Sequence, residues 1–205
     1  MGWKVPREWV GETAVCIASG PSLTTADVQY VRDKARVIVV NNNYQLAPWA
    51  DVLYACDGRW WRWHREAQKF AGLKVSLKVH GARPPDVRQL KKGQMRDLSL
   101  DPGVLNHGNN GGYQALNLAV LFGATRILLL GYDMKRTGDK AHWHKDHPIP
   151  TPDLFSGWRH NYATLVKPLA VSGVTVINCT RETALKCFPC QPLEQALPAE
   201  REAVA

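Results

Sequence analysis

The sequence of 205 residues lacks any long apolar run. A transmembrane helix needs about 20 consecutive apolar residues, and a secretory signal needs an apolar stretch of roughly 7 to 15 residues near the start. Neither pattern is present, because charged and polar residues interrupt the opening MGWKVPREWVGE. We therefore expect no membrane span and no secretory signal, and we predict a cytoplasmic location.

Several common ligand-binding signatures are also missing. The sequence contains neither the GxGxxG dinucleotide fingerprint, nor a phosphate loop of the form GxxxxGK followed by Ser or Thr, nor HExxH. Its five cysteines are odd in number and irregularly spaced, which disfavours a disulfide framework and fits a reducing compartment. Cys187 and Cys190 form a single CxxC without a second pair, so no redox or zinc role is favoured there.

Acidic residues are in the minority. Lys and Arg number 26 against 18 Asp and Glu, which gives a net charge of +8. A basic chain favours acidic partners such as nucleotides, nucleic acid or anionic surfaces. The basic residues are dispersed in short groups, so a basic solvent-exposed surface without a specific partner is the alternative.

Apolar strands alternate with helical segments along most of the chain. This alternation predicts a single Rossmann-like α/β domain over residues 1–192: a doubly wound, mostly parallel sheet of about six strands with helices on both faces. Residues 81–105 and 134–157 are expected to be irregular loops or a lid, and 193–205 a frayed tail. The predicted strands are 13–18, 36–40, 52–56, 73–79, 126–130 and 174–178. The predicted helices are 24–34, 59–70, 112–122 with Gly123 as its cap, and 158–171.

Small and polar residues follow the predicted strands. In parallel sheets, ligands bind beyond the carboxyl ends of the strands, so these residues would converge on one rim. They are Ser19, Gly20, Pro21, Ser22, Asn41, Asn42, Asn43, Asp57, Gly131, Tyr132 and Asp133, joined by Asn109, Asn110, Gly111 and Gly112 before the apolar helix. The convergence predicts a ligand site at this rim.

Each group on the rim suggests its own contact. The Gly20 turn opens a helix, whose free backbone N–H groups can bind an anion, although a plain strand-to-helix turn is the alternative. A carboxamide among Asn41, Asn42 and Asn43 can recognise a base or a sugar, because it both donates and accepts hydrogen bonds. Asp57 and Asp133 could orient a ribose, bind Mg²⁺ with phosphate, or cap a structural element.

The densest titratable cluster is HWHKDH, residues 142–147. His142, His144 and His147 could bind a metal, act in proton transfer, or belong to a solvated loop. We prefer proton transfer, because the pKa of histidine lies near neutral pH and the spacing places no pair on one helix face; no metal site is assigned. In the Trp-rich helix, Trp60, Trp61 and Trp63 are expected to pack, with one of Trp60 and Trp61 exposed.

Four segments together resemble the bacterial sialyltransferases of glycosyltransferase family 42. The segments are IASGPSL, VIVVNNNY, NNGGYQALNLAVLFGATRILLLGYDM and HWHKDH, and the resemblance runs in order through about residues 13 to 180. The same skeleton is similar to that of proteins related to archaeal hydroxymethylpterin pyrophosphokinase, and of small phage or prophage proteins. The resemblance implies a Rossmann-like fold and a nucleotide or nucleotide-sugar donor.

The resemblance also implies residue roles. Asn41 and Asp133 match an Asn and an Asp of the family, and Gly112 matches the Gly of its Ser-Gly pair. Ser19 and Gly111 depart from the pattern, since the family has Asn and Ser there. One of His142, His144 and His147 would be the catalytic base. Lys135 and Arg136 stand in the region of the tyrosines that assist the departing phosphate, and Lys135, Arg136 or a helix N-terminus would take over that role.

These observations favour a glycosyltransferase-like enzyme. It would bind a nucleotide-sugar donor, of the CMP type, and transfer the sugar to a hydroxyl acceptor with a His base. One alternative is an Mg²⁺-dependent (pyro)phosphotransferase of the pterin pyrophosphokinase type. The other is a non-enzymatic phage accessory protein that binds a nucleotide or nucleic acid through its basic surface.

Overall fold

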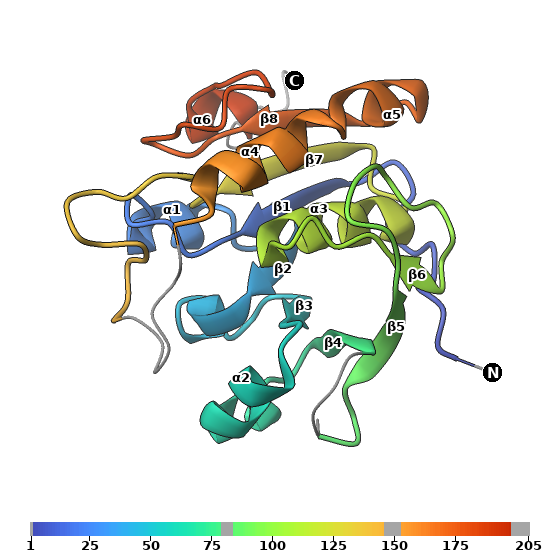
Figure 1. The fold of residues 1–205 in the computed structure, drawn as a ribbon. Coiled ribbons are helices and arrows are strands. Elements are labelled where there is room, and N and C mark those ends of the chain that lie inside the picture. Colours follow the sequence, from blue (N-terminus) through green and yellow to red (C-terminus); the bar gives the residue numbers. More distant parts are fainter. Residues whose placement is uncertain (1, 79–83, 146–152, 198–205) are drawn as a thin grey trace, which may run out of the picture.

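The computed structural model describes residues 2–78, 84–145 and 153–197 (Figure 1). One sheet runs through the described residues, with its strands in the order β6-β5-β4-β3-β2-β1-β7-β8, and every neighbouring pair is parallel. The strands are β1 (Thr13–Ile17), β2 (Arg36–Val40), β3 (Val52–Tyr54), β4 (Leu73–Lys78), β5 (Arg88–Lys92), β6 (Val104–Leu105), β7 (Arg126–Leu130) and β8 (Thr175–Asn178). This arrangement confirms the α/β class and the Rossmann-like architecture, with eight strands where about six were expected.

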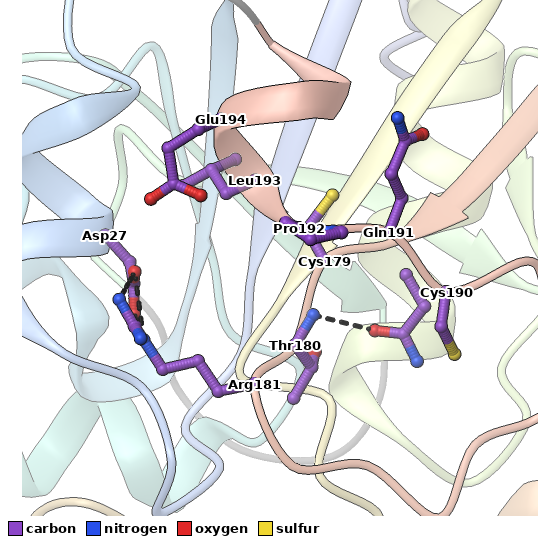
Figure 2. Close-up of a pocket in the computed structure, with 10 residues that line it drawn as sticks. Asp27, Cys179, Thr180, Arg181, Cys190, Gln191, Pro192, Leu193 and Glu194 are labelled. Carbon is purple, nitrogen blue, oxygen red and sulfur yellow. Dashed lines mark hydrogen bonds and ion pairs between the residues drawn. The ribbon is translucent and has the colours of Figure 1, made fainter.

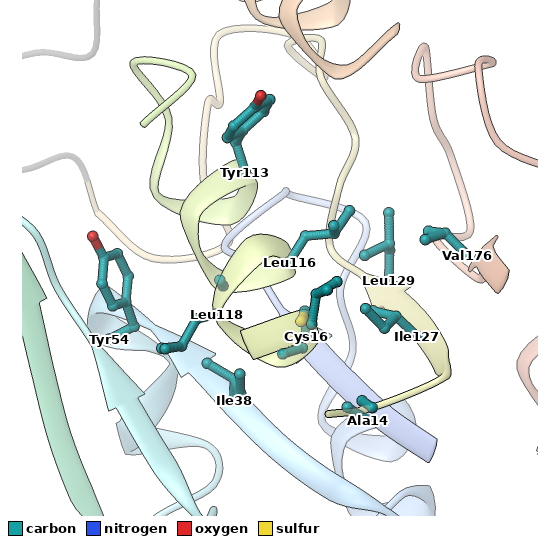
Figure 3. Packing of buried hydrophobic residues seen from close by; sticks show 14 of the residues in the cluster. Ala14, Cys16, Ile38, Tyr54, Tyr113, Leu116, Leu118, Ile127, Leu129 and Val176 are labelled. Carbon is teal, nitrogen blue, oxygen red and sulfur yellow. The ribbon is translucent and has the colours of Figure 1, made fainter. Parts of the chain in front are cut away.

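Helices cover both faces of the sheet (Figure 1). The helices are α1 (Thr25–Tyr30), α2 (Gly58–Trp63), α3 (Gly111–Phe122), α4 (Phe155–Ala163), α5 (Val166–Val171) and α6 (Leu193–Ala196), with 3₁₀ segments η1 (Asn41–Gln45) and η2 (Arg65–Lys69). On one face, Ala14 and Cys16 of β1 pack in the same cluster as α3, α4 and α5, and Figure 3 shows α3 lying over β1, β2 and β7. On the other face, Val15 and Ile17 pack with α1, α2 and α6. Because helices cover both faces of the central strands, their residues are apolar at successive positions.

Helix α3 is the central helix of the fold. Its residues from Gly112 to Phe122 are all buried, as its apolar composition predicts. Asn110 caps its start through a hydrogen bond from the Tyr113 N–H to Oδ1 (3.1 Å), and Gly123 ends it with a φ of 103°. A Cβ on Gly111 would lie 2.9 Å from Cγ1 of Val40, so the helix begins against the carboxyl end of β2.

The region 81–105 is more regular than the sequence suggests. The expectation of an irregular loop is wrong for 88–92 and 104–105, which form β5 and β6 at the edge of the sheet. Only Leu90 of β5 is buried, because the strand lies near an edge, so it has no apolar run that a sequence pattern could detect. β5 and β6 still pair with each other in parallel register, and the Lys91 N–H, for example, donates to the Gly103 carbonyl (2.9 Å).

Three further expectations need correction. The helix expected at 158–171 is two helices, α4 and α5, because Pro168 has no N–H and its ring disfavours a helical bond to Thr164. Trp60 and Trp61 are both buried, and only Trp63 is partly exposed, at 38%. The tail is ordered at its start, since Leu193 and Ala196 of α6 are buried; residues 198–205 lie outside the described residues. Among the described residues, none of the helices is both long and apolar enough to cross a membrane.

Candidate functional site

The Ser19–Ser22 turn is braced by the end of β7. The chain leaves β1 beside the end of β7, which is the point where the strand order of the sheet reverses. The Gly20 N–H donates to the Gly131 carbonyl (2.8 Å), and the Ser22 N–H donates to Oδ2 of Asp133 (2.9 Å). The small residues of this turn therefore allow close contact with the neighbouring strand end.

Asp133 helps to hold the Ser19–Ser22 turn against the end of β7. Its side chain is buried, and a Cβ on Gly20 would overlap its carboxylate and lie 2.5 Å from the Gly131 carbonyl oxygen. Burial raises the pKa of Asp133, although the hydrogen bonds from Ser22 oppose the shift. Tyr132 is also fully buried, and its hydroxyl donates to the Gly112 carbonyl (3.0 Å). Asp133 therefore holds the Ser22 turn, Tyr132 holds the start of α3, and both side chains are buried.

The three asparagines after β2 have different surroundings. Asn43 is fully buried: its Nδ2 donates to the carbonyls of Ile17 (3.1 Å) and Val40 (2.6 Å). Asn42 is buried too, and its Oδ1 accepts a hydrogen bond from Nε1 of Trp60 (2.8 Å). Asn41 is half-buried, adopts a φ of 53°, and makes no side-chain hydrogen bond to the described residues. Of the three, Asn41 is the one whose carboxamide is not already bonded to a described residue.

The histidine loop docks onto the same rim through Trp143. The Trp143 Nε1–H donates to Oδ1 of Asn43 (2.8 Å), and its backbone N–H donates to the Ser19 carbonyl (3.0 Å). Trp143 therefore holds His142 and His144 beside the ends of β1 and β2, and the rings of those two histidines stack with centroids 5.0 Å apart. His147, the third predicted candidate, lies outside the described residues.

Replacing Trp143 by phenylalanine tests whether this side chain anchors the histidine loop to the rim. The change leaves the buried Oδ1 of Asn43 without its indole donor, so we expect the free energy of unfolding to fall by about 1–2 kcal/mol. Urea denaturation measures the loss. Trp63→Phe is the matched control, since Trp63 is partly exposed, and it should change the free energy of unfolding by about 0.5 kcal/mol or less. Equal effects of the two changes would argue against the anchor.

A cavity of about 790 Å³ opens where β3, β4 and β5 end, between α2 and the start of α3. Asp57, Asn109, Asn110 and Gly111 line it, and these four belong to the predicted rim. The Oδ1 of Asn110 is used by Tyr113 and by the Tyr162 hydroxyl (2.9 Å), which leaves its Nδ2 without a partner among the described residues. The remaining lining residues are Cys56, Arg59, Arg62, Leu77, Lys92, His107 and Gln114.

The lining of this cavity is cationic. Asp57 caps α2 by accepting from the Arg59 N–H (2.8 Å), and its carboxylate pairs with the Arg59 guanidinium (3.0 Å). Its charge is therefore compensated. Arg62 and Lys92 form no ion pair with any described residue, so two positive charges remain at the start of a helix whose dipole is positive there. The cavity is suited to an anionic ligand.

The other predicted charged residues are engaged elsewhere. Lys135 pairs with Glu182 (3.1 Å), and Arg136 donates to the Asp139 carbonyl (2.9 Å) within its own loop. Asp57 and Asp133 follow β3 and β7, which are three strand spacings apart in the sheet, or about 14 Å. In this arrangement the two carboxylates do not share one metal ion, and over the described ranges no three His, Cys, Asp or Glu side chains come together as metal ligands.

Sequence reasoning located the rim but missed most of the cavity lining. It singled out neither Arg62, Lys92 nor His107. Arg59 and Arg62 are three residues apart on a predicted helix, so this spacing could have indicated a shared basic face. Lys92 lies on β5, a strand that has no apolar pattern, so nothing in the sequence indicated that it faces the cavity.

A second cavity, of about 370 Å³, lies between α1, α6 and the end of β8 (Figure 2). Among the described residues that line it, Arg181 is the one cation, and it pairs with Asp27 through Nη2 (2.7 Å) and Nε. Burial would raise the pKa of Asp27, but hydrogen bonds from Arg181 and Thr24 outweigh it and lower the pKa. Asp27 also completes the capping box of α1 with Thr24. The pair links the start of α1 to the segment after β8 and has a structural role.

The sequence matches no protein-family model and no curated protein. Two solved structures of the sialyltransferase CstII from Campylobacter jejuni resemble its fold. One, in complex with the substrate analogue cytidine-5'-monophosphate, is 11% identical with a TM-score of 0.52, and the alignment covers 90% of this chain and 86% of that chain. The other, in complex with CMP-3FNeuAc, is 10% identical with a TM-score of 0.54 and covers 93% and 89%. The chain therefore has the α/β fold of these sialyltransferase structures.

Proposed function

We propose that this chain is a glycosyltransferase-like enzyme that binds a nucleotide-sugar donor of the CMP type and transfers the sugar to a hydroxyl acceptor. The observation that carries the proposal is the cationic cavity at the start of α3, where Arg62 and Lys92 have no counter-charge among the described residues. The proposal is supported by the fold, which is that of an enzyme solved with CMP and with CMP-3FNeuAc.

The cavity offers separate contacts for the parts of such a donor. The phosphate would lie at the start of α3, against Lys92 and Arg62, since a helix N-terminus and unpaired cations both attract anions. Nδ2 of Asn110 and the exposed Asn109 would donate to the base or the ribose. Asn41 lies next to Val40, which contacts the start of α3, and so borders the same site.

The base in the proposed reaction is one of His142, His144 and His147. Its imidazole would take the proton of the acceptor hydroxyl while the acceptor oxygen bonds to the anomeric carbon. The bond between that carbon and the phosphate oxygen breaks, and its electrons leave with the nucleotide. The cations of the cavity would stabilise the charge that develops on the departing phosphate. Since Lys135 is paired with Glu182, we assign this role to Arg62 and Lys92 in place of Lys135 and Arg136.

Calorimetry of the protein with CMP, UDP, GDP and their sugars tests the donor. We expect CMP and CMP-sugars to bind, and Lys92→Gln to weaken CMP binding about tenfold, because a hydrogen bond to a charged group is lost. Lys91→Gln is the matched control. Lys91 is the next residue of β5 but lines a different cavity, with Trp3 and Lys4, so this variant should bind CMP within about twofold of the wild type.

Two results would count against the proposal. One is that no nucleotide or nucleotide-sugar binds to the intact protein. The other is that the protein turns over ATP only with Mg²⁺ present and transfers no sugar, which would favour the (pyro)phosphotransferase alternative.

A further inference from the structure

His107 is a buried histidine that lines the cavity at the start of α3. It lies between β6 and α3, and only 7% of it is exposed. Its backbone is fixed on both sides: its N–H donates to the Gln94 carbonyl (2.9 Å), and its carbonyl accepts from Nε2 of Gln114 (2.7 Å). The imidazole is therefore held in one place at the wall of the cavity.

The hydrogen bonding of the ring determines its tautomer. The Asn109 backbone N–H donates to Nδ1 of His107 (3.2 Å), so Nδ1 carries no proton. A neutral imidazole with an accepting Nδ1 carries its proton on Nε2. Burial and the nearby charge of Lys92 lower the pKa of His107, which favours this neutral form. The ring is consequently a hydrogen-bond donor at Nε2.

No described residue accepts a hydrogen bond from this Nε2. The groups around it are donors as well. The first-turn N–H group of Gly111, which lines the cavity, has no partner within the helix and donates to no described residue. Lys92 and Arg62 add two cations on the same cavity. The unpaired donors on this wall favour an acceptor in the cavity, and the two unpaired positive charges favour an anionic one.

We infer that His107 is a ligand-binding residue that donates its Nε2–H to an oxyanion bound at the start of α3, between Lys92 and Arg62. The inference deepens the proposed function and rests on the same cavity. It gives His107 a role distinct from that of the base in the 142–147 loop, because its Nδ1 is occupied and its Nε2 already carries the proton. The oxyanion is a phosphate or a carboxylate of the ligand.

Two substitutions of His107 test the roles of its two ring nitrogens separately. Asparagine at 107 can keep an acceptor for the Asn109 N–H but has no donor at the Nε2 position, whereas glutamine can place a donor there. We expect His107→Asn to weaken the binding of pyrophosphate and of CMP about tenfold in calorimetry. His107→Gln should stay within about threefold of the wild type. Equal losses in both variants, or no loss in His107→Asn, would overturn the inference.

A measurement on the unchanged protein guards against a variant that does not fold. The Nε2 proton of His107 should shift in the NMR spectrum when pyrophosphate is added, and acetate should reproduce the shift if a carboxylate is also accepted. The absence of any shift at saturating pyrophosphate would overturn the inference.

The same data distinguish this inference from the proposed function. Binding of pyrophosphate that depends on His107, with no binding of any nucleotide, would uphold the inference and overturn the proposed function. Binding of CMP that is unaffected by His107→Asn would uphold the proposed function and overturn the inference.

Discussion

Replacing Gly131 by alanine is expected to lower the free energy of unfolding by about 3–4 kcal/mol. Gly131 has a φ of 69°, a conformation that costs other residues about 1–2 kcal/mol. A Cβ at this position would also overlap the backbone carbonyl of Ala18, which cannot move without disturbing β1. The loss should appear as a lower urea midpoint with an unchanged dependence on urea concentration.

Gly138→Ala separates the two contributions. Gly138 also has a positive φ, of 56°, but a Cβ there would meet nothing within 4 Å. This variant should lower the free energy of unfolding by about 1 kcal/mol, which is the cost of the positive φ alone. If Gly131→Ala were no more destabilising than Gly138→Ala, the close packing of the ends of β1 and β7 would not matter for stability.

Replacing the base of the 142–147 loop by alanine is expected to reduce kcat for sugar transfer by about 10²- to 10⁴-fold. The dissociation constant for CMP should remain within about twofold, since the cavity that would bind the nucleotide is lined by other residues. Single substitutions of His142, His144 and His147 identify the base, measured as transfer from the donor to an acceptor alcohol. The rings of His142 and His144 stack on each other. If one of them is the base, replacing the other should reduce kcat by a smaller factor.

His160→Ala is the control for these variants, because His160 is exposed on α4, outside the 142–147 segment. It should keep full activity. If all three loop variants kept kcat within about fivefold of the wild type, a histidine base in this loop would be excluded. If the pH–rate profile of a single variant shifts to higher pH, the histidine replaced in that variant positions another group and does not itself transfer the proton.

The sequence predicted the centre of the fold and the edge strand β8 better than the opposite edge, which β5 and β6 form. Strands flanked by helices on both sides carry unbroken apolar runs, and α3 is apolar all round, so these elements were identifiable. The strands β5 and β6 have few buried residues, and their pairing depends on neighbours distant in sequence. A local pattern contains no information about such pairing.

The candidate site, like the fold, was predictable in part from the sequence. The rule that ligands bind beyond the carboxyl ends of strands located the rim, and Asp57, Asn110 and Gly111 do line a cavity there. The rule does not distinguish polar side chains that face a cavity from those that bond to the protein. Asn43 illustrates the difference, because only the structure shows that its carboxamide is bound by Val40, Ile17 and Trp143.

The position of β1 in the sheet has a consequence for how the chain folds. β1 pairs with β2 soon after it in the sequence, but its other partner, β7, follows only after β3, β4, β5, β6 and α3. Until β7 is in place, one side of β1 has unpaired backbone groups. Long-range parallel pairing of this kind forms slowly, because a large loop must close before its contacts are gained. During synthesis, the first half of the chain therefore exposes an open edge of β1 until β7 pairs with it.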